Sequence, residues 1–404
     1  MKYIDGGVCA AKGFKAAGVR CGIRKNQTKK DLALIVSDVP ASAAGVYTTN
    51  LVKGAPIYVT KANIADGMAQ AVICNSGNAN TCNANGIEIA EGMCALVEKH
   101  AGVKANDVIV ASTGVIGQPL SLDPIKAGMP QLVSELSYDG GMSAAQAIMT
   151  TDTFAKSVAV QFELGGKTCT IGGIAKGSGM IHPNMATMLV FVTTDAAIAP
   201  EMLNKALKAD VQSSFNMVSV DGDTSTNDML CIMANGMAGN ALIESDGADY
   251  RAFCKALAAV TQTLCRNIAK DGEGATKLLT CRASGAADVQ TARVVAKSVI
   301  CSSLFKAAMF GADANWGRVL CAIGYSGAAV DVDKIGVSFA SKAGSITVCE
   351  NGAGVPFSEE IAKKVLTEDE ITIEVTLGMG TEEATAWGCD LTYDYVKING
   401  DYRT

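Results

Sequence analysis

The stretch of residues 175–194 places the strongest constraint on how this chain folds. It opens with a glycine-rich turn at residues 176–179 and then passes through His182-Pro183-Asn184, which interrupts any regular element. The apolar run at residues 188–192 is too short for a helix and is typical of a buried strand. Thr187 stands at the start of that strand. The stretch therefore predicts a hydroxyl side chain presented at a sheet edge, with glycine backbone close to it.

A chain of 404 residues exceeds what one hydrophobic core usually supports, so we expect two domains. Hydrophobic residues make up 49% of the chain, aromatic residues make up only 5%, and glycine occurs 42 times. This composition favours closely packed layers of sheet and helix. The net charge of −6, with no local basic run, argues against nucleic acid as a partner.

The 14 cysteines are scattered singly through apolar stretches, and no Cys-x-x-Cys pair occurs. With only two histidines, His100 and His182, a metal site would depend almost entirely on thiolates, and no spacing supports one. We therefore expect reduced cysteines that serve as small core residues, and hence a reducing cytoplasm. The N-terminus lacks the apolar region of a signal peptide, and no uninterrupted apolar stretch would span a membrane. Neither a metal nor a membrane is expected as a partner.

Short β-type runs separated by glycine turns fill the N-terminal part of the chain, and residues 32–36 and 56–60 are both expected to be strands. Another strand at residues 69–74 leads into a loop rich in asparagine and glycine at residues 75–86. Because these residue types tolerate positive φ, the loop is expected to be compact. It either simply turns the chain or shapes a pocket. An amphipathic helix is expected at residues 87–100.

The strand expected at residues 107–111 ends in Ser112-Thr113-Gly114. A β-branched strand that stops at Thr-Gly can point backbone N–H groups away from the sheet, which is one way to form an oxyanion hole. Many strands without such a function end in the same way. Thr153 stands in a Thr-Thr-Asp-Thr run just before another expected strand, at residues 156–163.

Residues 221–228 carry acidic side chains at spacings that invite comparison with a calcium-binding loop. An EF-hand loop that starts at Asp221 would need glycine where Thr226 stands and glutamate where Ile232 stands. We therefore expect a hydrogen-bonded turn at this position.

The clearest helical pattern covers residues 249–269 and stops at a turn in which Glu273 lies between two glycines. This carboxylate either belongs to a solvated turn or contacts a ligand. Residues 283–287 resemble a short linker. A helix expected at residues 288–306, followed by strands near 345–349, 370–376 and 385–392, predicts a second, smaller α+β domain.

The residues also limit the chemistry. His182 is the only plausible histidine for a Ser-His-Asp arrangement, and it precedes a proline, so it could instead orient its loop. No Gly-x-Ser-x-Gly elbow, Walker loop or dinucleotide fingerprint is present. A threonine nucleophile needs no histidine if chain cleavage frees its own α-amine. With a pKa of about 7.7 to 8.0, that amine acts as a general base near neutral pH.

Residues 176–189 closely resemble the self-cleavage site of the ornithine acetyltransferase family, the glutamate N-acetyltransferases of arginine biosynthesis. The resemblance extends over nearly the whole chain. It is carried by Gly6-Gly7-Val8 with Lys12-Gly13-Phe14, Asn75-Ser76-Gly77-Asn78-Ala79-Asn80, Ser112-Thr113-Gly114, residues 221–228, residues 271–277, Asn315-Trp316-Gly317-Arg318 and Asp401-Tyr402-Arg403-Thr404.

The resemblance implies that the chain cuts itself between Ala186 and Thr187, which then serves as an N-terminal nucleophile. Thr187 would take the acetyl group from N2-acetylornithine as an acyl-enzyme and pass it to glutamate. Thr113 and Gly114 match the oxyanion hole of the family. The matching substrate-binding positions are Thr153, Lys176, Thr187, Glu273, Asn399 and Thr404. A lysine suits an α-carboxylate and a glutamate suits an ammonium group.

Transfer of an acetyl group from one amine to another conserves the amide, so the resemblance implies no cofactor and no metal. Whether acetyl-CoA also donates an acetyl group stays open, and the family tends toward assemblies of two α and two β fragments. The implied fold is α+β: a four-layer αββα sandwich like that of N-terminal-nucleophile hydrolases, with a smaller C-terminal α+β domain. We place the first domain at residues 1–282 and the second, which would close the site, at residues 283–404.

The sequence departs from the family pattern at Ala314, where the family usually has proline, and at Cys9 and Ala11. These departures leave the implied site residues unchanged. Two other interpretations remain: an N-terminal-nucleophile aminopeptidase or amidase, in which water replaces glutamate, and a non-catalytic binding protein in which residues 188–192 form only a core strand.

Overall fold

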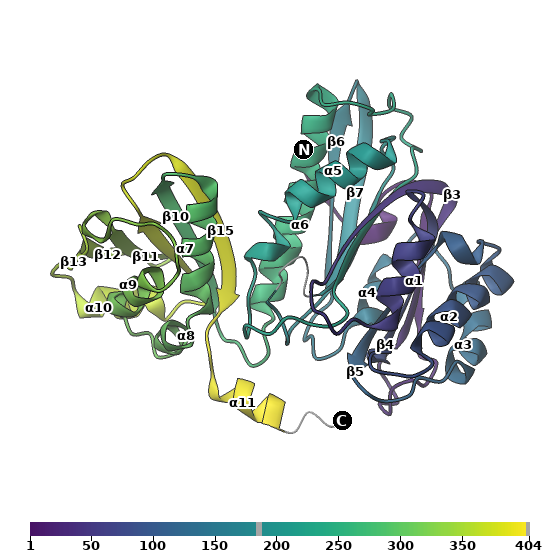
Figure 1. Cartoon of the computed structure of the whole chain (residues 1–404), viewed down its shortest axis with the longest axis horizontal. Helices are drawn as coiled ribbons and strands as arrows, with labels where there is room; N and C mark the ends of the chain where they lie inside the picture. Colours follow the sequence, from purple (N-terminus) through teal and green to yellow (C-terminus); the bar gives the residue numbers. More distant parts are fainter. Residues whose placement is uncertain (183–187, 401–404) are drawn as a thin grey trace. The chain divides into compact units, whose positions relative to one another are not determined.

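The computed structural model describes residues 1–182 and 188–400, which form two compact units (Figure 1). The first unit consists of Met1–Gly177, Pro183–Asn216 and Thr224–Leu264. The second consists of Ser178–His182, Met217–Asp223 and Cys265–Thr404. The units are therefore not continuous in sequence, because two short segments of the first half of the chain fold with the C-terminal part.

A nine-stranded mixed sheet forms the centre of the first unit, with the order β1-β6-β7-β8-β9-β3-β4-β5 and β2 paired with β3. The strands are β1 (Lys2–Ile4), β2 (Phe14–Val19), β3 (Leu32–Tyr47), β4 (Met68–Asn78), β5 (Val108–Val115), β6 (Lys156–Leu164), β7 (Lys167–Lys176), β8 (Leu189–Thr194) and β9 (Met229–Ala234). The first half of β3 pairs with β2 and β4, whereas its second half pairs with β9. This long strand thus connects two layers of sheet.

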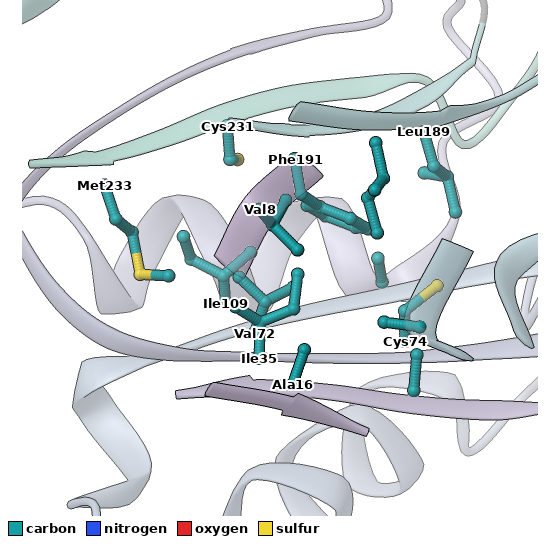
Figure 2. Packing of buried hydrophobic residues seen from close by; sticks show 14 of the residues in the cluster. Val8, Ala16, Ile35, Val72, Cys74, Ile109, Leu189, Phe191, Cys231 and Met233 are labelled. Atoms are coloured by element: carbon teal, nitrogen blue, oxygen red, sulfur yellow. The ribbon is translucent and has the colours of Figure 1, made fainter. Parts of the chain in front are cut away.

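The core between the two sheet layers follows from period-two alternation along the strands. In Figure 2, Leu189 and Phe191 of β8 face Ile35 of β3, Val72 of β4 and Ile109 of β5. The intervening side chains, such as Leu34 and Ile73, belong to a second cluster on the opposite face. Both faces of these strands are apolar, so each face needs a covering layer.

Helices cover the outer faces and complete the four layers. The six helices that contribute to this unit are α1 (Ala55–Asn63), α2 (Gly86–Ala101), α3 (Asp123–Ser134), α4 (Gly141–Ile148), α5 (Pro200–Asp210) and α6 (Ala248–Lys270). Side chains of α2 and α3 pack in the same cluster as Leu34 and Ile73. On the other layer, Phe253 of α6 lies 6.3 Å from Phe162 of β6 between ring centroids. The predicted αββα sandwich is confirmed.

The strand expected at residues 56–60 is wrong, because these residues lie within α1. Pro56 occupies the first turn of this helix, where the missing N–H of proline is not needed by the hydrogen-bond ladder. The β-branched composition of the segment favours a strand. The helix is stabilised instead by contacts with the sheet, because Ile57 and Thr60 are buried and the Thr60 hydroxyl donates to the Val110 carbonyl of β5. The expected strand at residues 69–74 and the expected helices at 87–100 and 249–269 are confirmed as β4, α2 and α6.

A six-stranded mixed sheet, with the order β13-β12-β11-β14-β10-β15, forms the second unit. Its strands are β10 (Leu278–Ala286), β11 (Gly336–Ser341), β12 (Gly344–Glu350), β13 (Ala353–Gly354), β14 (Glu370–Thr376) and β15 (Glu382–Cys389). Its helices are α7 (Val289–Cys301), α8 (Ser303–Phe310), α9 (Trp316–Gly324), α10 (Glu359–Leu366) and α11 (Tyr393–Gly400). Short 3₁₀ turns lie at Gly7–Cys9, Ala105–Asp107, Phe215–Met217 and Val332–Lys334.

The linker expected at residues 283–287 is wrong, because most of it continues β10. This strand pairs with β14 and β15 over residues that include Ala283. The expected domains 1–282 and 283–404 therefore differ from the two units, since β10 belongs to the second unit in full. The helix expected at 288–306 is divided at Ser302, whose side chain accepts a hydrogen bond from the Phe305 N–H and so caps α8.

Candidate active site

Thr113 and Gly114 lie at the end of β5, beside the end of β4. Thr113 is buried, and Gly114 has a φ of +134°, a conformation open almost only to glycine. Asn78 pairs with both Thr113 and Val115, which is a bulge in the ladder. A Cβ atom on Gly114 would lie 2.2 Å from the carbonyl carbon of Gly77. The strand end is therefore a close backbone-to-backbone contact that requires glycine.

Buried polar side chains hold this strand end in place. The Ser112 hydroxyl donates to Asn75 Oδ1 at 2.6 Å. Asn227 Nδ2 donates to the Ser112 carbonyl at 3.0 Å and to the Ala79 carbonyl at 2.5 Å, while its Oδ1 accepts from Thr81 at 2.6 Å. Because these groups are buried and satisfied, they fix the backbone next to Thr113. The loop at residues 75–86 is thus an ordered support for β5, and Asn227 links it to the loop at residues 221–228.

A buried charge cluster lies at the end of β7. Asp152 and Lys156 form an ion pair at 2.7 Å with no exposed side-chain surface, and the Gly177 N–H donates to Asp152 Oδ1 at 2.7 Å. Burial alone would raise the pKa of the Asp152 carboxyl, but the charges of Lys176 and Lys156 and the hydrogen bonds from Lys156 and Gly177 outweigh it. The pKa of Asp152 therefore lies below its ordinary value, and the carboxylate stays ionised beside two ammonium groups.

Lys176 is the last residue of β7, and its side chain is 8% exposed. Burial raises the pKa of the Cys74 thiol in β4 to about 12, while the charges of Lys176 and Arg24 act in the opposite direction. Cys74 is followed by Asn75, which binds Ser112. The charge of Lys176 therefore acts on Cys74, which precedes the residue of β4 that holds Ser112, next to Thr113.

Thr153, by contrast, is exposed, next to the buried Asp152.

In the second unit, Glu273 and Asn399 are direct partners. The Asn399 side-chain amide donates to Glu273 Oε2 at 2.8 Å, and the Glu273 N–H donates to the Ser178 carbonyl at 3.0 Å. Glu273 is 7% exposed, so the interpretation as a solvated turn is wrong. The carboxylate retains acceptor capacity for a ligand ammonium group, since the amide contact engages only one of its oxygens.

His182 lies in the second unit among polar side chains. Its Nδ1 lies 3.0 Å from Ser219 Oγ and 3.6 Å from Cys301 Sγ. Burial and the charge of Lys297 lower the pKa of His182 to about 4, although Asp221 acts in the opposite direction. The imidazole is therefore neutral at physiological pH, and these contacts orient the residue within its loop.

Substituting His182 with glutamine is expected to reduce the sensitivity of the protein to acid. Between pH 6.5 and pH 4 the unfolded chain binds a proton at residue 182 that the folded chain does not, so the free energy of unfolding falls as the pH decreases through this window. Allowing for the partial exposure of the ring, the contribution is about 1 kcal/mol. Urea unfolding at pH 7, 5.5 and 4.5 measures it. His100→Gln is the control, and an equal change in both variants would contradict the assignment.

Three of the sequence-predicted site residues, Ala186, Thr187 and Thr404, lie outside the described residues. Of the others, Thr113, Gly114, Thr153 and Lys176 belong to the first unit, and Glu273 and Asn399 to the second. Sequence reasoning missed Asp152 as the counter-charge of Lys176. The signal available was an aspartate in a Thr-Thr-Asp-Thr run next to an expected strand, since charged residues in such a position are rarely buried without a partner.

The described part of the chain also bears on metal and membrane binding. Among residues 1–182 and 188–400, no group of three or more His, Cys, Asp or Glu side chains is arranged to hold a metal ion. No helix in those ranges is both long and apolar enough to cross a lipid bilayer. The 14 cysteines are free thiols.

Comparison with known proteins identifies the family. The profile of the ArgJ family matches residues 15–404. This chain belongs to the ArgJ family. It is 53% identical over 406 aligned positions to the arginine biosynthesis bifunctional protein ArgJ of Symbiobacterium thermophilum, with 100% of both chains covered. It is 52% identical to arginine biosynthesis bifunctional protein ArgJ 1 of Clostridium acetobutylicum, with 97% of this chain and 96% of the relative covered.

A solved structure within the ArgJ family is also similar. The crystal structure of the arginine biosynthesis bifunctional protein ArgJ of Bacillus halodurans has 47% sequence identity and a TM-score of 0.50. The match covers 52% of this chain and 97% of that chain. The family resemblance expected from the sequence motifs is confirmed.

Proposed function

We propose that this protein is an acetyltransferase of arginine biosynthesis that moves the acetyl group of N2-acetylornithine to glutamate through an acyl-enzyme on Thr187. One observation carries the proposal: the chain matches, along its whole length, relatives named as arginine biosynthesis bifunctional proteins ArgJ. The strand end at Thr113-Gly114 and the buried Lys176 supply the kind of groups that this reaction needs.

Self-cleavage comes first in the proposed mechanism. The Thr187 hydroxyl attacks the carbonyl carbon of Ala186, the C–N bond breaks, and the α-amine of Thr187 leaves with a proton. Water then hydrolyses the resulting ester. The products are an α fragment of 186 residues and a β fragment of 218 residues (404 − 186). The Bacillus halodurans chain supports this proposal, because it matches only 52% of the present chain although 97% of that chain is covered.

Acetyl transfer follows at the new N-terminus. The α-amine of Thr187 accepts the hydroxyl proton while the oxygen attacks the acetyl carbonyl, and ornithine leaves as the protonated amine. The amine of glutamate then attacks the threonyl ester, and the hydroxyl regains its proton. We propose that Thr113 and the Gly114 N–H bind the oxyanion formed in both steps. The end of β5 favours such a role, because its bulge requires glycine at position 114 and buried hydrogen bonds hold the neighbouring Ser112 in place.

The substrate-binding roles follow from charge. The ammonium group of Lys176, whose charge is balanced within the protein by the nearby Asp152, would bind the α-carboxylate that ornithine and glutamate share. Glu273, held by Asn399, suits an ammonium group. Thr153 and Thr404 would complete the contacts through hydroxyl groups. No cofactor or metal takes part in this scheme.

Because the relatives are named bifunctional, we also propose that acetyl-CoA donates an acetyl group to glutamate as a second reaction. An assembly of two α and two β fragments in the cytoplasm completes the proposal. The 14 free thiols agree with a reducing compartment.

The decisive experiment combines a denaturing gel with N-terminal sequencing of the purified protein. The parent chain is expected to give two fragments, one starting at Met1 and the other at Thr187. Thr187→Ala should remain a single chain and lose acetyl transfer completely, because it lacks the nucleophilic hydroxyl, whereas Thr187→Ser should still divide. A second N-terminus elsewhere, or division of the alanine variant, would contradict the mechanism.

Release of ornithine from N2-acetylornithine separates transfer from hydrolysis. We expect release only when glutamate is present, with one N-acetylglutamate formed for each ornithine. Release at the same rate in buffer without glutamate would identify an N-terminal-nucleophile amidase instead. Replacing N2-acetylornithine with acetyl-CoA in the same assay tests the second donor.

A further inference from the structure

Arg24 contacts the segment at residues 149–153, which leads from α4 toward β6. Its guanidinium donates a hydrogen bond to the Met149 carbonyl. We propose that Arg24 is a positioning residue for substrate binding, because it holds this segment in place and so fixes Thr153 relative to the strand end at Thr113-Gly114. This inference rests on the proposed function and adds a residue that the proposed mechanism does not use. All of these residues belong to the first unit.

The loop that carries Arg24 is fixed by a buried carboxylate. Asp31 has no exposed surface, and its carboxylate accepts three backbone N–H groups. These belong to Cys21 at 2.6 Å, Gly22 at 3.1 Å and Arg24 at 3.1 Å. Hydrogen bonds from N–H groups to a carboxylate are about twice as strong as those between neutral groups. The Asp31 carbonyl in turn accepts the Ser76 N–H of β4 at 2.9 Å, so the backbone of the loop is held beside β4.

The Arg24 side chain lies against Gly77, near the end of β4. A Cβ atom on Gly77 would lie 2.7 Å from Arg24 Cγ and 3.6 Å from Arg24 Nε, so glycine leaves the space that the arginine occupies. Gly77 pairs with Gly114 of β5 in close backbone contact. Burial raises the pKa of the Cys74 thiol to about 12, and the charges of Lys176 and Arg24 act in the opposite direction. Both charges therefore lie near the end of β4 that pairs with the proposed oxyanion site.

The group that Arg24 binds lies at the C-terminal end of α4. Met149 is the C-cap of this helix, where carbonyl groups have no partner within the helix. A cation at such an end is also favoured by the helix dipole. Next to this contact, the Ser76 hydroxyl of β4 donates to the Ala147 carbonyl at 2.6 Å. Two side chains, one from the loop and one from β4, thus hold the end of α4 against the end of β4.

Beyond Met149 the segment is held at a second point, Asp152. The Asp152 carboxylate accepts the Thr150 N–H at 2.9 Å, and its buried ion pair with Lys156 keeps it in place. Thr153 follows directly and is exposed. The segment is therefore short and held at both ends, so loss of the contact at Met149 lets it shift and carry Thr153 with it. A displacement of about 1 Å in a group that positions a substrate costs up to about a hundredfold in activity.

The test compares the steady-state kinetics of the cleaved enzyme and its variants. Arg24→Met removes both the hydrogen bond and the charge. We expect the KM for N2-acetylornithine and the KM for glutamate to rise about tenfold, the effect of one hydrogen bond to a charged group. The kcat should stay within about twofold, because the backbone pairing of β4 with β5 does not involve the Arg24 side chain. Arg24→Lys keeps a charged donor and should restore most of the loss in KM.

Lys30→Met is the matched control. Lys30 belongs to the same loop, and its ammonium group donates to the Ser143 hydroxyl near the start of α4. The substitution therefore removes another link between a cation of this loop and α4 without touching the segment at residues 149–153. Its KM values should equal those of the parent. Urea unfolding of both variants shows whether the loop is loosened in general.

A double-mutant cycle with Thr153→Val tests whether Arg24 acts through Thr153. The valine removes the hydroxyl that is proposed to contact the substrate and keeps the shape of the side chain. If Arg24 works by placing that hydroxyl, the double variant should have a KM no higher than that of the weaker-binding single variant. A purely structural role of Arg24 would instead multiply the two increases in KM.

The outcomes keep this inference apart from the proposed function. If the parent enzyme transfers no acetyl group, the proposed function fails and this inference fails with it. If the parent is active and a folded Arg24→Met enzyme keeps the parent KM values, only the inference is overturned. Equal increases in KM for Arg24→Met and Lys30→Met, or multiplied effects in the cycle, would overturn it too. If Arg24→Met does not fold or divide, Arg24→Gln, which has a shorter and uncharged side chain, replaces it with the same expectations.

Discussion

Replacing Gly114 with alanine is expected to lower the free energy of unfolding by about 3 kcal/mol and to abolish self-cleavage. The φ of +134° is unfavourable for any residue with a Cβ atom, and that atom would lie 2.2 Å from the Gly77 carbonyl carbon and 2.5 Å from the Asn78 nitrogen. Both contacts are to backbone, so no side-chain rotation relieves them. Either β4 or β5 has to move at the position where the oxyanion is proposed to bind.

Gly117→Ala is the matched control for this prediction. Gly117 lies three residues further along, has a φ of +76°, and has open space around the position of a Cβ atom. Its replacement should cost only the backbone preference of glycine, about 1 kcal/mol, and leave cleavage intact. Urea unfolding and denaturing gels measure both effects. If the two variants lose the same free energy and both still divide, the close contact at Gly114 has no special role.

The second large effect is expected for Asp152→Asn, which leaves the buried ammonium groups of Lys156 and Lys176 without their common counter-charge. Removing one partner of a buried ion pair costs about 3–5 kcal/mol. We expect a loss of free energy of unfolding in this range and, because Lys176 is displaced, weaker binding at the substrate contact proposed for it. Chemical denaturation gives the first quantity, and the KM for N2-acetylornithine of the cleaved enzyme gives the second.

Glu360→Gln provides a control with the same sequence spacing. Glu360 and Lys364 form an i,i+4 ion pair at 2.9 Å, but their side chains are 81% and 66% exposed. Loss of such a surface pair is expected to change the free energy of unfolding by less than about 0.5 kcal/mol. A comparable change in both variants would show that burial of the Asp152–Lys156 pair does not matter.

Many strands of the first unit could be predicted from local sequence, because they are short apolar runs whose successive side chains pack on opposite faces of the sheet. Residues 69–74 lie in β4, and the strand expected at residues 107–111 lies in β5 from Val108 onward, whereas Asp107 ends a 3₁₀ turn. The expectation at residues 56–60 failed because a β-branched run fits either a strand or a helix that packs on a sheet. Only the contacts of Ile57 and Thr60 distinguish the two.

Candidate functional residues could be predicted where they belong to a recognisable sequence motif. They could not be predicted where their role depends on a contact with a residue far away in the sequence. Thr113, Gly114 and Lys176 stand in recognisable stretches, and the resemblance assigns them roles. Asp152 has a near partner in Lys156, but it also lies close to the charge of Lys176, which is 24 residues away (176 − 152). Asn227 binds Ala79, which is 148 residues away. Local pattern contains no information about such pairs.

By itself, the sequence determined the family, the layered α+β architecture and the position of the candidate nucleophile, because these depend on periodicity and on a long specific motif. The tertiary structure alone decided that residues 178–182 fold with the C-terminal unit, that β10 belongs to its sheet, and that the buried Asp152 carboxylate pairs with Lys156 close to the charge of Lys176. The physical reason is that hydrogen bonds, ion pairs and strand pairing act between atoms that the folded backbone brings together. Their effects cannot be read from neighbours in the chain.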